Sequence, residues 1–321
     1  MIRRVGVLTS GGDAPGMNAA LRAIVRSGLK NGLEMFVVYE GYKGLIEGLI
    51  EKVDRNFVSD IINRGGTIIK SARSREFKEE SARLVAVEQL KNFGIDSLIV
   101  IGGDGTYMGA KKLTELGINC IGLPGTIDND LTSSDYTIGF DTALNTICEC
   151  VDKLRDTTAS HQRCTIIEVM GNKCGDLALF SGVAEGVEMI ITPERPIPEE
   201  EIMQRIKTLG TGKKKHSLII VSEKVFPNVI SFAEKVTQET GFEARAEVLG
   251  RLQRGGAPSA YDRILATRMG VYAIEILLAG KQGVCVGIVD GKLVNYPFDE
   301  AFALPRKTHD ELYDLISTVN R

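Results

Sequence analysis

Short apolar runs alternate along the chain with longer segments in which apolar residues recur every three or four positions. The short runs lie at residues 5–9, 97–101, 118–123, 164–169, 189–192, 218–221 and 284–289. They predict buried strands, because they are brief and do not alternate with polar residues. The helical period appears at residues 19–25, 107–116, 142–154 and 262–278. This alternation predicts an α/β fold in which helices cover a mostly parallel sheet.

Glycine-rich turns follow two of the predicted strands. Residues 10–16 come after the strand at 5–9, and Asn18 is expected to cap the helix that begins there. Gly-Gly-Asp-Gly-Thr at residues 102–106 follows the strand at 97–101. Open α/β sheets bind ligands at the carboxyl ends of their strands, and helix N-termini bind phosphate, so both turns are candidate phosphate loops. The alternative is a tight turn without a ligand.

Length and composition limit the class of protein. A chain of 321 residues exceeds the ~250–300 at which one core stops growing, which predicts two α/β lobes. The net charge of −3 offers no basic surface for nucleic acid or anionic lipid. Six cysteines without a Cys-x-x-Cys pair and three scattered histidines indicate reduced thiols and no zinc site. No membrane helix or export signal is visible, so we expect a cytoplasmic protein.

Carboxylates stand in two of the loops that follow strands. Asp104, in the second glycine turn, could bind Mg²⁺ through oxygen ligands, or could be an ordinary turn residue. Asp128 and Asp130 lie in Pro-Gly-Thr-Ile-Asp-Asn-Asp at residues 124–130. Phosphoryl transfer to an alcohol needs a carboxylate that accepts the hydroxyl proton. Chemistry alone leaves both aspartates as candidates.

Arginines form two groups with different interpretations. Arg22 and Arg26 are spaced i, i+4 and share a helix face, where like charges repel unless an anion bridges them. A solvated helix face is the alternative. Arg245, Arg251 and Arg254 lie near the point where a strand is expected to end in a Gly-Gly turn. They could hold a phosphate in bidentate fashion, or belong to a surface loop.

The chain resembles the bacterial ATP-dependent 6-phosphofructokinases over nearly its whole length. The resemblance rests on four segments in the family's order, at residues 8–18, 101–106, 122–130 and 252–256. Gly-Gly-Asp-Gly-Thr also occurs in lipid and NAD kinases, whereas the combination is specific. It implies transfer of the ATP γ-phosphate to the 1-hydroxyl of fructose 6-phosphate in glycolysis, with Mg²⁺, by a homotetramer.

The resemblance also implies a domain organisation. We expect two Rossmann-like three-layer α/β/α lobes with mostly parallel sheets and an active-site cleft between them. The larger, ATP-binding lobe would comprise residues 1–139 and 252–304. The smaller, fructose 6-phosphate-binding lobe would comprise residues 140–251 and 305–321.

Matching positions in the family imply residue roles. Asp128 would be the base, Thr126 and Asp130 would help to organise the site, and Asp104 would be the metal-associated carboxylate. The residues expected around ATP are Gly12, Arg73, Ser74, Gly103, Asp104, Gly105 and Thr106. The residues expected around fructose 6-phosphate are Thr126, Ile127, Asp128, Arg163, Met170, Gly171, Asn172, Glu223, Arg245, Arg251, Leu252, Gln253 and Arg254. Arg163 and Arg245 would come from a neighbouring subunit.

An effector site for ADP as activator or phosphoenolpyruvate as inhibitor is implied in the same way. Its expected residues are Arg22, Arg26, Arg55, Ser59, Asp60, Arg155, Gly186, Glu188, Lys214 and His216. An effector acts only through different affinities for two states, so these residues predict binding more directly than control.

The phosphoryl donor can also be inferred. Pyrophosphate-dependent relatives usually carry aspartate at the position of Gly105 and lysine at that of Gly125. A carboxylate at position 105 would repel the nucleotide α-phosphate, so the two glycines favour ATP. A pyrophosphate-dependent enzyme is one alternative. A regulatory nucleotide- or sugar-phosphate-binding paralogue with weakened catalysis is the other.

Three positions depart from the family pattern. Asn172 stands where relatives commonly have an arginine near the transferring phosphate, Arg251 replaces a histidine, and Ser74 replaces an aromatic residue. Loss of one preorganised donor can cost ~3 kcal/mol in a transition state, so Asn172→Arg is expected to raise turnover. Lys173 is a candidate replacement for the missing cation.

Overall fold

The computed structural model describes residues 2–212 and 215–319, which fold into two compact units. The first unit comprises Met1–Thr142 and Arg254–Arg306, and the second comprises Ala143–Gln253 and Lys307–Arg321. Each unit has its own sheet with helices on both faces, so the predicted α/β class is confirmed. No helix in the described part of the chain has the length and apolar character needed to cross a bilayer.

The first unit contains a seven-stranded sheet with the order β11-β10-β5-β4-β1-β2-β3. Its strands are β1 (Arg4–Thr9), β2 (Glu34–Val38), β3 (Ile50–Val53), β4 (Ser97–Gly102), β5 (Asn119–Pro124), β10 (Val284–Val289) and β11 (Lys292–Pro297). The inner strands are parallel, whereas the edge strands β3 and β11 pair antiparallel. Every residue of β4 is buried, as expected for a parallel strand covered on both faces.

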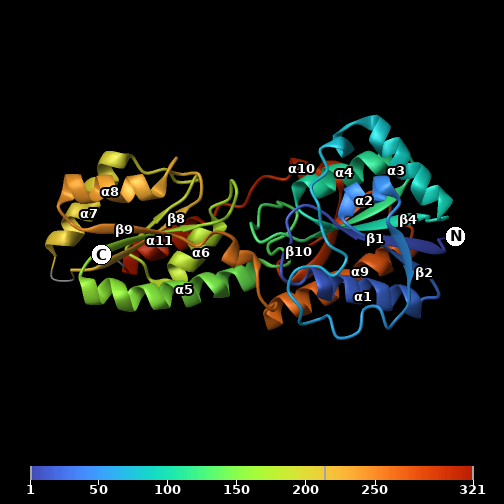
Figure 1. Ribbon diagram of the computed structural model, residues 1–321, viewed down its shortest axis with the longest axis horizontal. Helices are drawn as coiled ribbons and strands as arrows, with labels where there is room; N and C mark the ends of the chain where they lie inside the picture. Colours follow the sequence, from blue (N-terminus) through green and yellow to red (C-terminus); the bar gives the residue numbers. More distant parts are fainter. Residues whose placement is uncertain (1, 213–214, 320–321) are drawn as a thin grey trace. The chain divides into compact units, whose positions relative to one another are not determined.

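Helices form a layer on each face of this sheet (Figure 1). The helices α1 (Met17–Lys30) and α9 (Ala260–Leu278) pack against each other on one face. The other face is covered by α2 (Gly41–Glu47), α3 (Glu80–Asn92), α4 (Asp104–Glu115) and α10 (Phe298–Ala303). Tyr42, Tyr107 and Phe298 belong to one apolar cluster on that face.

Asn18 does not cap the first helix, so that prediction is wrong. Helix α1 begins at Met17 and its N-cap is Gly16, which has a left-handed backbone with φ 106°. The buried Asn18 side chain instead donates to the carbonyl of Arg64 at 3.0 Å and accepts from the N–H of Ile68 at 2.8 Å. It therefore fixes a distant loop rather than its own helix.

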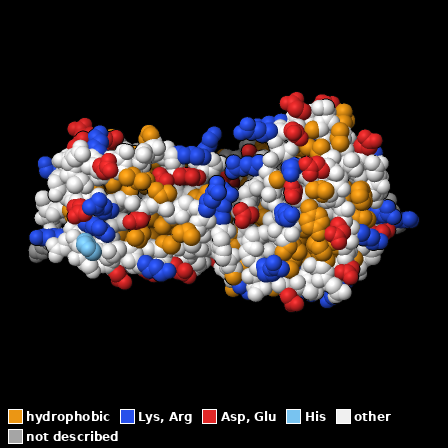
Figure 2. All heavy atoms as spheres, in the orientation of Figure 1, with side chains coloured by type: hydrophobic (Ala, Val, Ile, Leu, Met, Phe, Trp, Pro, Cys, Tyr) orange, Lys and Arg blue, Asp and Glu red, His pale blue; other side chains and the backbone are white. Residues whose placement is uncertain are grey.

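The second unit contains a four-stranded parallel sheet with the order β7-β8-β6-β9. Its strands are β6 (Cys164–Val169), β7 (Met189–Ile191), β8 (Ser217–Ser222) and β9 (Ala244–Val248). One face carries α5 (Phe140–His161), α6 (Asp176–Glu185) and α11 (Asp310–Val319), and the other carries α7 (Glu199–Thr211) and α8 (Val229–Thr240). Figure 2 shows acidic and basic side chains interspersed over the visible face of each unit.

Candidate active site

Three candidate loops leave the first sheet at the carboxyl ends of neighbouring strands. Strands β1, β4 and β5 are adjacent, with Thr9 opposite Ile101 and Gly102 opposite Pro124. The N–H of Gly125 donates to the carbonyl of Gly102 at 3.1 Å, which joins two of the loops directly. The predicted phosphate turns and the aspartate loop therefore lie side by side at one edge of the sheet.

Thr106 holds the first glycine turn against the start of α4. Its hydroxyl donates to the carbonyl of Ser10 at 3.0 Å, and the side chain is buried. A Cβ atom at Gly102 would lie 2.3 Å from Thr106 Oγ1 and 2.4 Å from the Ser10 carbonyl oxygen, so only glycine fits. Helix α4 has no side-chain N-cap, and its first N–H groups are therefore suited to an anion.

Packing explains one of two glycines in these loops but not the other. A Cβ atom at Gly125 would lie 2.8 Å from Ile101 Cγ2 and 3.1 Å from Met17 Cε, so packing alone requires glycine there. A Cβ atom at Gly105 would meet no atom within 4 Å in the described part of the chain. Packing within the chain therefore does not explain why residue 105 is a glycine, whereas a bound ligand would.

The aspartate loop is fixed by Asn129, which sequence reasoning did not identify. This residue has a left-handed backbone with φ 51°, a conformation that asparagine tolerates better than most residues. Its side chain accepts from the N–H of Thr137 at 3.0 Å and donates to the carbonyl of Asp135 at 3.1 Å. Asp128 and Asp130 thus flank a residue that is bonded to the neighbouring segment. The only sequence signal for this role of Asn129 is its position between two aspartates.

Asp104 and Asp130 line one cavity of about 140 Å³ within the first unit. Thr132 and Ser133 lie in its wall and add hydroxyl oxygens, and Tyr107 also contributes to it. Leu131, Ala301 and Phe302 form the apolar part of the lining. Mg²⁺ prefers oxygen ligands and usually retains several waters, so the two carboxylates are the groups of this cavity that suit the ion. The N–H of Asp128 donates to Thr126 Oγ1 at 3.1 Å on the same loop.

Arg254 lies against the first glycine turn. A Cβ atom at Gly12 would be 2.7 Å from Arg254 Nη1, so the glycine makes room for the guanidinium group. Arg254 Nε is buried and has no hydrogen-bond partner among the described residues. A buried guanidinium N–H without a partner in the protein suits an anionic ligand.

The arginines near residue 254 are not at the end of a strand as predicted. Strand β9 ends at Val248, and a 3₁₀ helix, η2 (Gly250–Arg254), follows it before the two glycines. Arg251 and Leu252 are exposed on this helix. The prediction of a strand ending in the Gly-Gly turn is therefore wrong, because an extra helical turn intervenes.

Arg73 and Ser74 lie in an irregular segment before a second 3₁₀ helix, η1 (Glu76–Lys78). The Arg73 side chain is exposed. The Ser74 hydroxyl accepts from the N–H of Phe77 at 3.2 Å, which is a local capping contact. An aromatic side chain could not make this bond.

In the second unit, the predicted sugar-phosphate residues follow β6 and β8. Gln253 is fully buried; its Oε1 accepts from the N–H of Met170 at 3.1 Å and its Nε2 donates to the carbonyl of Gly250 at 2.9 Å. Gln253 therefore joins two backbone segments rather than facing solvent. Glu223 Oε1 accepts from the N–H of Asn172 at 2.7 Å.

Arg163 and Arg245 lie at the opposite edge of this sheet. Arg163 precedes β6, whereas Met170 follows it, and Arg245 is paired with Thr165 near the start of β6. At ~3.3 Å per residue, Arg163 and Met170 are roughly 20 Å apart. Within the second unit, these two arginines therefore lie at the opposite end of the sheet from the predicted sugar-phosphate residues that follow β6 and β8.

The effector residues of the first unit form a cluster. Arg26 Nη2 donates to Ser59 Oγ at 3.5 Å. Partial burial lowers the pKa of Arg26, the positive charges of Arg22 and Arg55 lower it further, and Asp60 opposes them. Arg26 Nε is buried without a hydrogen-bond partner in the described part of the chain. The charges of Arg22 and Arg55 thus act on Arg26, and Asp60 supplies a negative charge to the same cluster.

The effector residues of the second unit lie at the amino edge of its sheet. Glu188 Oε2 accepts from the N–H of Leu218 at 2.7 Å, and His216 directly precedes β8. Arg155 forms an ion pair with Glu185 at 3.1 Å, one residue before Gly186. Lys214 lies outside the described residues.

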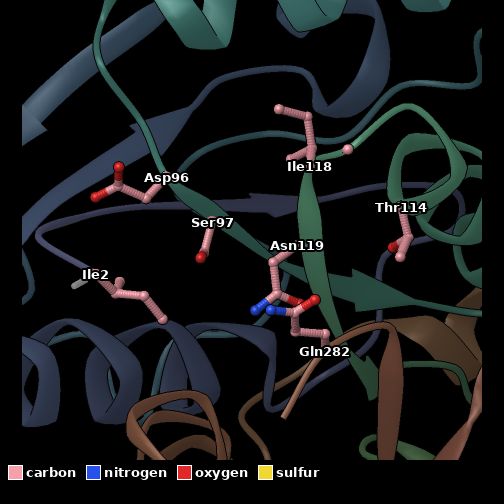
Figure 3. Close-up of a pocket in the computed structure, with 8 residues that line it drawn as sticks. Ile2, Asp96, Ser97, Thr114, Ile118, Asn119 and Gln282 are labelled. Atoms are coloured by element: carbon pink, nitrogen blue, oxygen red, sulfur yellow. The ribbon is translucent and has the colours of Figure 1, made fainter. Parts of the chain in front are cut away.

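Another cavity, of about 240 Å³, lies at the amino edge of the first sheet (Figure 3). Its lining includes Ser97 and Asn119, the first residues of β4 and β5. Its carboxylate, Asp96, already accepts from the N–H groups of Arg3 and Arg4, at 2.7 and 2.9 Å. None of the predicted site residues lines this cavity.

Comparison with known proteins shows which family the chain is similar to. The phosphofructokinase family model matches residues 4–277. The ATP-dependent 6-phosphofructokinase of Photobacterium profundum is 53% identical over 316 residues, which cover 98% of both chains. That of Edwardsiella ictaluri is 55% identical over 301 residues, or 94% of both chains.

Solved structures show the same fold. A phosphofructokinase from Saccharomyces cerevisiae matches with a TM-score of 0.88 and 34% identity over 98% of this chain. The match covers 50% of the yeast chain, so the present chain spans half its length. A pyrophosphate-dependent phosphofructokinase from Marinobacter aquaeolei matches with a TM-score of 0.85 and 22% identity, over 97% of this chain and 86% of that one.

Proposed function

The chain belongs to the phosphofructokinase family, and we propose that it is a cytoplasmic, glycolytic ATP-dependent 6-phosphofructokinase. In this proposal it transfers the γ-phosphate of ATP to the 1-hydroxyl of fructose 6-phosphate and releases ADP. The observation that carries the proposal is the meeting of the three family loops at the carboxyl ends of β1, β4 and β5 in a chain 53% identical to such an enzyme.

Asp128 is the proposed base. A carboxylate that accepts the hydroxyl proton makes the sugar oxygen a better nucleophile as phosphorus is attacked. The bonds of Asn129 to Thr137 and Asp135 support this role, because they restrict the loop on both sides of the carboxylate. The Thr126 hydroxyl accepts a hydrogen bond from the N–H of Asp128, and Thr126 would help to orient Asp128.

The first unit is the proposed nucleotide-binding unit. The uncapped start of α4 and the turn at Gly12 would bind phosphate oxygens of the nucleotide. Asp104 and Asp130 would hold Mg²⁺, directly or through water, in the cavity that they share. When bound, Mg²⁺ neutralises charge on the phosphoryl oxygens. The open space at Gly105 would lie beside the nucleotide and favours ATP over pyrophosphate.

The second unit is the proposed sugar-phosphate-binding unit. Met170, Gly171, Glu223 and Arg251 would contact the sugar, together with Arg254. Because Arg163 and Arg245 lie at the other edge of the sheet, they would serve a neighbouring chain. We therefore propose a homotetramer in which each sugar-phosphate site uses residues of two chains.

The cluster of Arg22, Arg26 and Arg55 supports a binding site for anionic effectors, namely ADP or phosphoenolpyruvate. Arg26→Met should leave the melting temperature unchanged or slightly raised without ligand, since like-charge repulsion is relieved. The stabilisation by added ADP should fall in this variant, because binding to the native state shifts unfolding by mass action. An undiminished shift with ADP would exclude Arg26 from the site.

A donor assay tests the proposed function. Purified protein is incubated with fructose 6-phosphate, Mg²⁺ and either ATP or pyrophosphate, and fructose 1,6-bisphosphate is measured. Turnover should require ATP. Faster turnover with pyrophosphate would favour the pyrophosphate-dependent alternative. Binding of nucleotide without turnover from either donor would favour a regulatory binding protein.

A further inference from the structure

The loops that follow β6 and β8 carry a lysine, Lys224, that is not among the predicted site residues. The two strands are neighbours, with Val169 opposite Ser222 in register. The N–H of Glu223 donates to the carbonyl of Val169 at 2.8 Å, so the second loop begins beside the first. Both loops lie at the carboxyl edge of the sheet, where open α/β sheets bind ligands.

The first of these loops is closed tightly. The N–H of Cys174 donates to the carbonyl of Gly171 at 2.8 Å, and the Ser222 hydroxyl donates to the carbonyl of Cys174 at 3.3 Å. Gly171 has φ 138°, and a Cβ atom there would lie 2.2 Å from the Cys174 carbonyl oxygen, so only glycine fits. Asn172 is therefore held at the tip of a fixed turn.

Asn172 contacts two charged residues of the second loop at once. Its backbone N–H donates to Glu223 Oε1 at 2.7 Å, and its side-chain Oδ1 accepts from Lys224 Nζ at 2.6 Å. Lys224 has a left-handed backbone with φ 68°, which is unfavourable for a lysine. Strained residues of this kind concentrate at ligand sites. Asn172 therefore binds a carboxylate through its backbone and an ammonium group through its side chain.

The positive charge of Lys224 is available to an anionic ligand. Its hydrogen-bond partner is a neutral amide, and Lys224 forms no salt bridge among the described residues. A lysine has three donors, of which this bond uses one, and the side chain is exposed. Glu223 is engaged by the N–H of Asn172. A phosphate could therefore receive two further N–H bonds from a localised positive charge.

We propose that Lys224 binds a phosphoryl group of the substrates and that Asn172 positions it. The group is either the 6-phosphate of the sugar or the phosphate in transfer. The inference rests on the proposed function, because it assumes that the second unit receives the sugar phosphate. It also changes the expectation that Asn172→Arg raises turnover. In this proposal Lys224 of the neighbouring loop supplies the cation, so neither an arginine at position 172 nor Lys173 is needed.

Charge removal tests the proposal. Lys224→Met keeps most of the side-chain length and removes the ammonium group, and Lys207→Met, at an exposed lysine on α7 of the same unit, is the matched control. We expect kcat/KM for fructose 6-phosphate to fall about tenfold or more in Lys224→Met and to stay near wild type in Lys207→Met. A raised KM for the sugar would identify the 6-phosphate as the bound group. A lowered kcat with unchanged KM values would identify the phosphate in transfer.

A rescue experiment separates charge from structure. In the Lys224→Met background, Asn172→Arg returns a cation to the same loop pair and should recover much of the lost kcat/KM. In the wild-type background, Asn172→Arg removes the acceptor of Lys224 and places a like charge beside it, so it should give no gain.

The failures of the two proposals can be told apart. Unchanged kinetics in Lys224→Met, or an equal loss in Lys207→Met, would overturn the inference while the wild type still used ATP. A folded wild type without turnover from either donor would overturn the proposed function instead. Equal melting temperatures of the variants confirm that the comparison is made between folded proteins.

Discussion

Asp128 and Asp96 are aspartates at opposite edges of the same seven-stranded sheet, and their surroundings differ. Asp96 lies at the amino edge and accepts two backbone N–H bonds, from Arg3 and Arg4. Asp128 follows β5 at the carboxyl edge, in the loop fixed by Asn129. The difference makes one residue a candidate base and the other a structural acceptor.

Asparagine substitution at both positions compares the two roles. Asp128→Asn should lower kcat by roughly 10²–10⁴-fold, the usual contribution of a general base, while ATP still binds. Asp96→Asn should leave kcat unchanged, since an amide oxygen can still accept from the backbone. Steady-state kinetics and nucleotide titration measure both effects. A nearly normal kcat in Asp128→Asn would remove this residue from the chemistry.

Gly105 offers a test of donor choice that does not depend on packing. Because a Cβ atom there meets nothing within 4 Å, Gly105→Asp should fold with an unchanged melting temperature. The new carboxylate near the nucleotide phosphates would cost roughly 1–4 kcal/mol, so the KM for ATP should rise about tenfold or more. Gly105→Ser, small and uncharged, is the control. An equal rise in both variants would point to size rather than charge.

Residues that tie distant backbone segments together could not be predicted from the sequence. Asn18, Asn129 and Gln253 each bond to main-chain groups, and two of them reach loops about 50 and 80 residues away. Nothing in the local sequence distinguishes an asparagine or glutamine that binds a distant main-chain group from one that faces solvent. The two glycine turns and the aspartate loop could be located, because glycine and carboxylate patterns follow apolar runs directly.

In the first sheet, the apolar runs predict β1, β4, β5 and β10, whereas the inner strand β2 and the edge strands β3 and β11 were not predicted. The runs that correspond to β4 and β10 contain almost no polar residue, because both faces of these strands are covered. The edge strands β3 and β11 are partly exposed and contain charged or polar residues, so no such run marks them. Helix α3 is only weakly amphipathic and was likewise absent from the prediction.

Asp262 connects the starts of two long helices. It lies in the first turn of α9 and is fully buried. Its carboxylate accepts from the N–H of Gly139 at 2.9 Å and from the N–H and hydroxyl of Thr142 at 2.8 and 2.5 Å. These bonds cap the N-terminal end of α5. The first turn of α5 is thus attached to α9 through one side chain.

The pH dependence of stability should report on this carboxylate. Burial raises the pKa of Asp262 from 3.8 to about 6, against hydrogen bonds from Thr142 and Gly139. The folded-state pKa lies above the unfolded one, so the stabilisation by protonation is complete below pH ~4 and is lost as the pH rises through ~6. Wild type should lose up to about 3 kcal/mol of unfolding free energy in this range relative to Asp262→Asn.

Urea unfolding at several pH values measures this difference. Other titrating groups are common to both proteins and cancel. Asp156→Asn, on an exposed position of α5, is the control and should follow wild type. Parallel stability curves for wild type and Asp262→Asn would contradict the raised pKa.

On the scale of the whole molecule, the opposed positions of Arg163 and Met170 predict that a single chain has an incomplete sugar-phosphate site. Asp128→Asn and Arg163→Ala should each be inactive alone. When they are mixed, dissociated and reassembled, about a quarter of sites should combine both intact residues if the shared interface is isologous. A coupled activity assay measures the recovery.

The matched control mixes Asp128→Asn with Asp130→Asn. These aspartates lie on one loop of one chain, so every site retains a defect and activity should stay low. If the first mixture recovers no more activity than this control, Arg163 does not act across chains.

The order of strands in the first sheet also has a consequence for biosynthesis. Strand β10 pairs with β5, yet it leaves the ribosome about 160 residues later, after the core of the second unit has been translated. At ~5–20 residues per second, the apolar edge of β5 waits roughly 10–30 s for its neighbour. During that interval the nascent chain exposes an unpaired strand edge, which makes it a natural client for chaperones that bind emerging polypeptides.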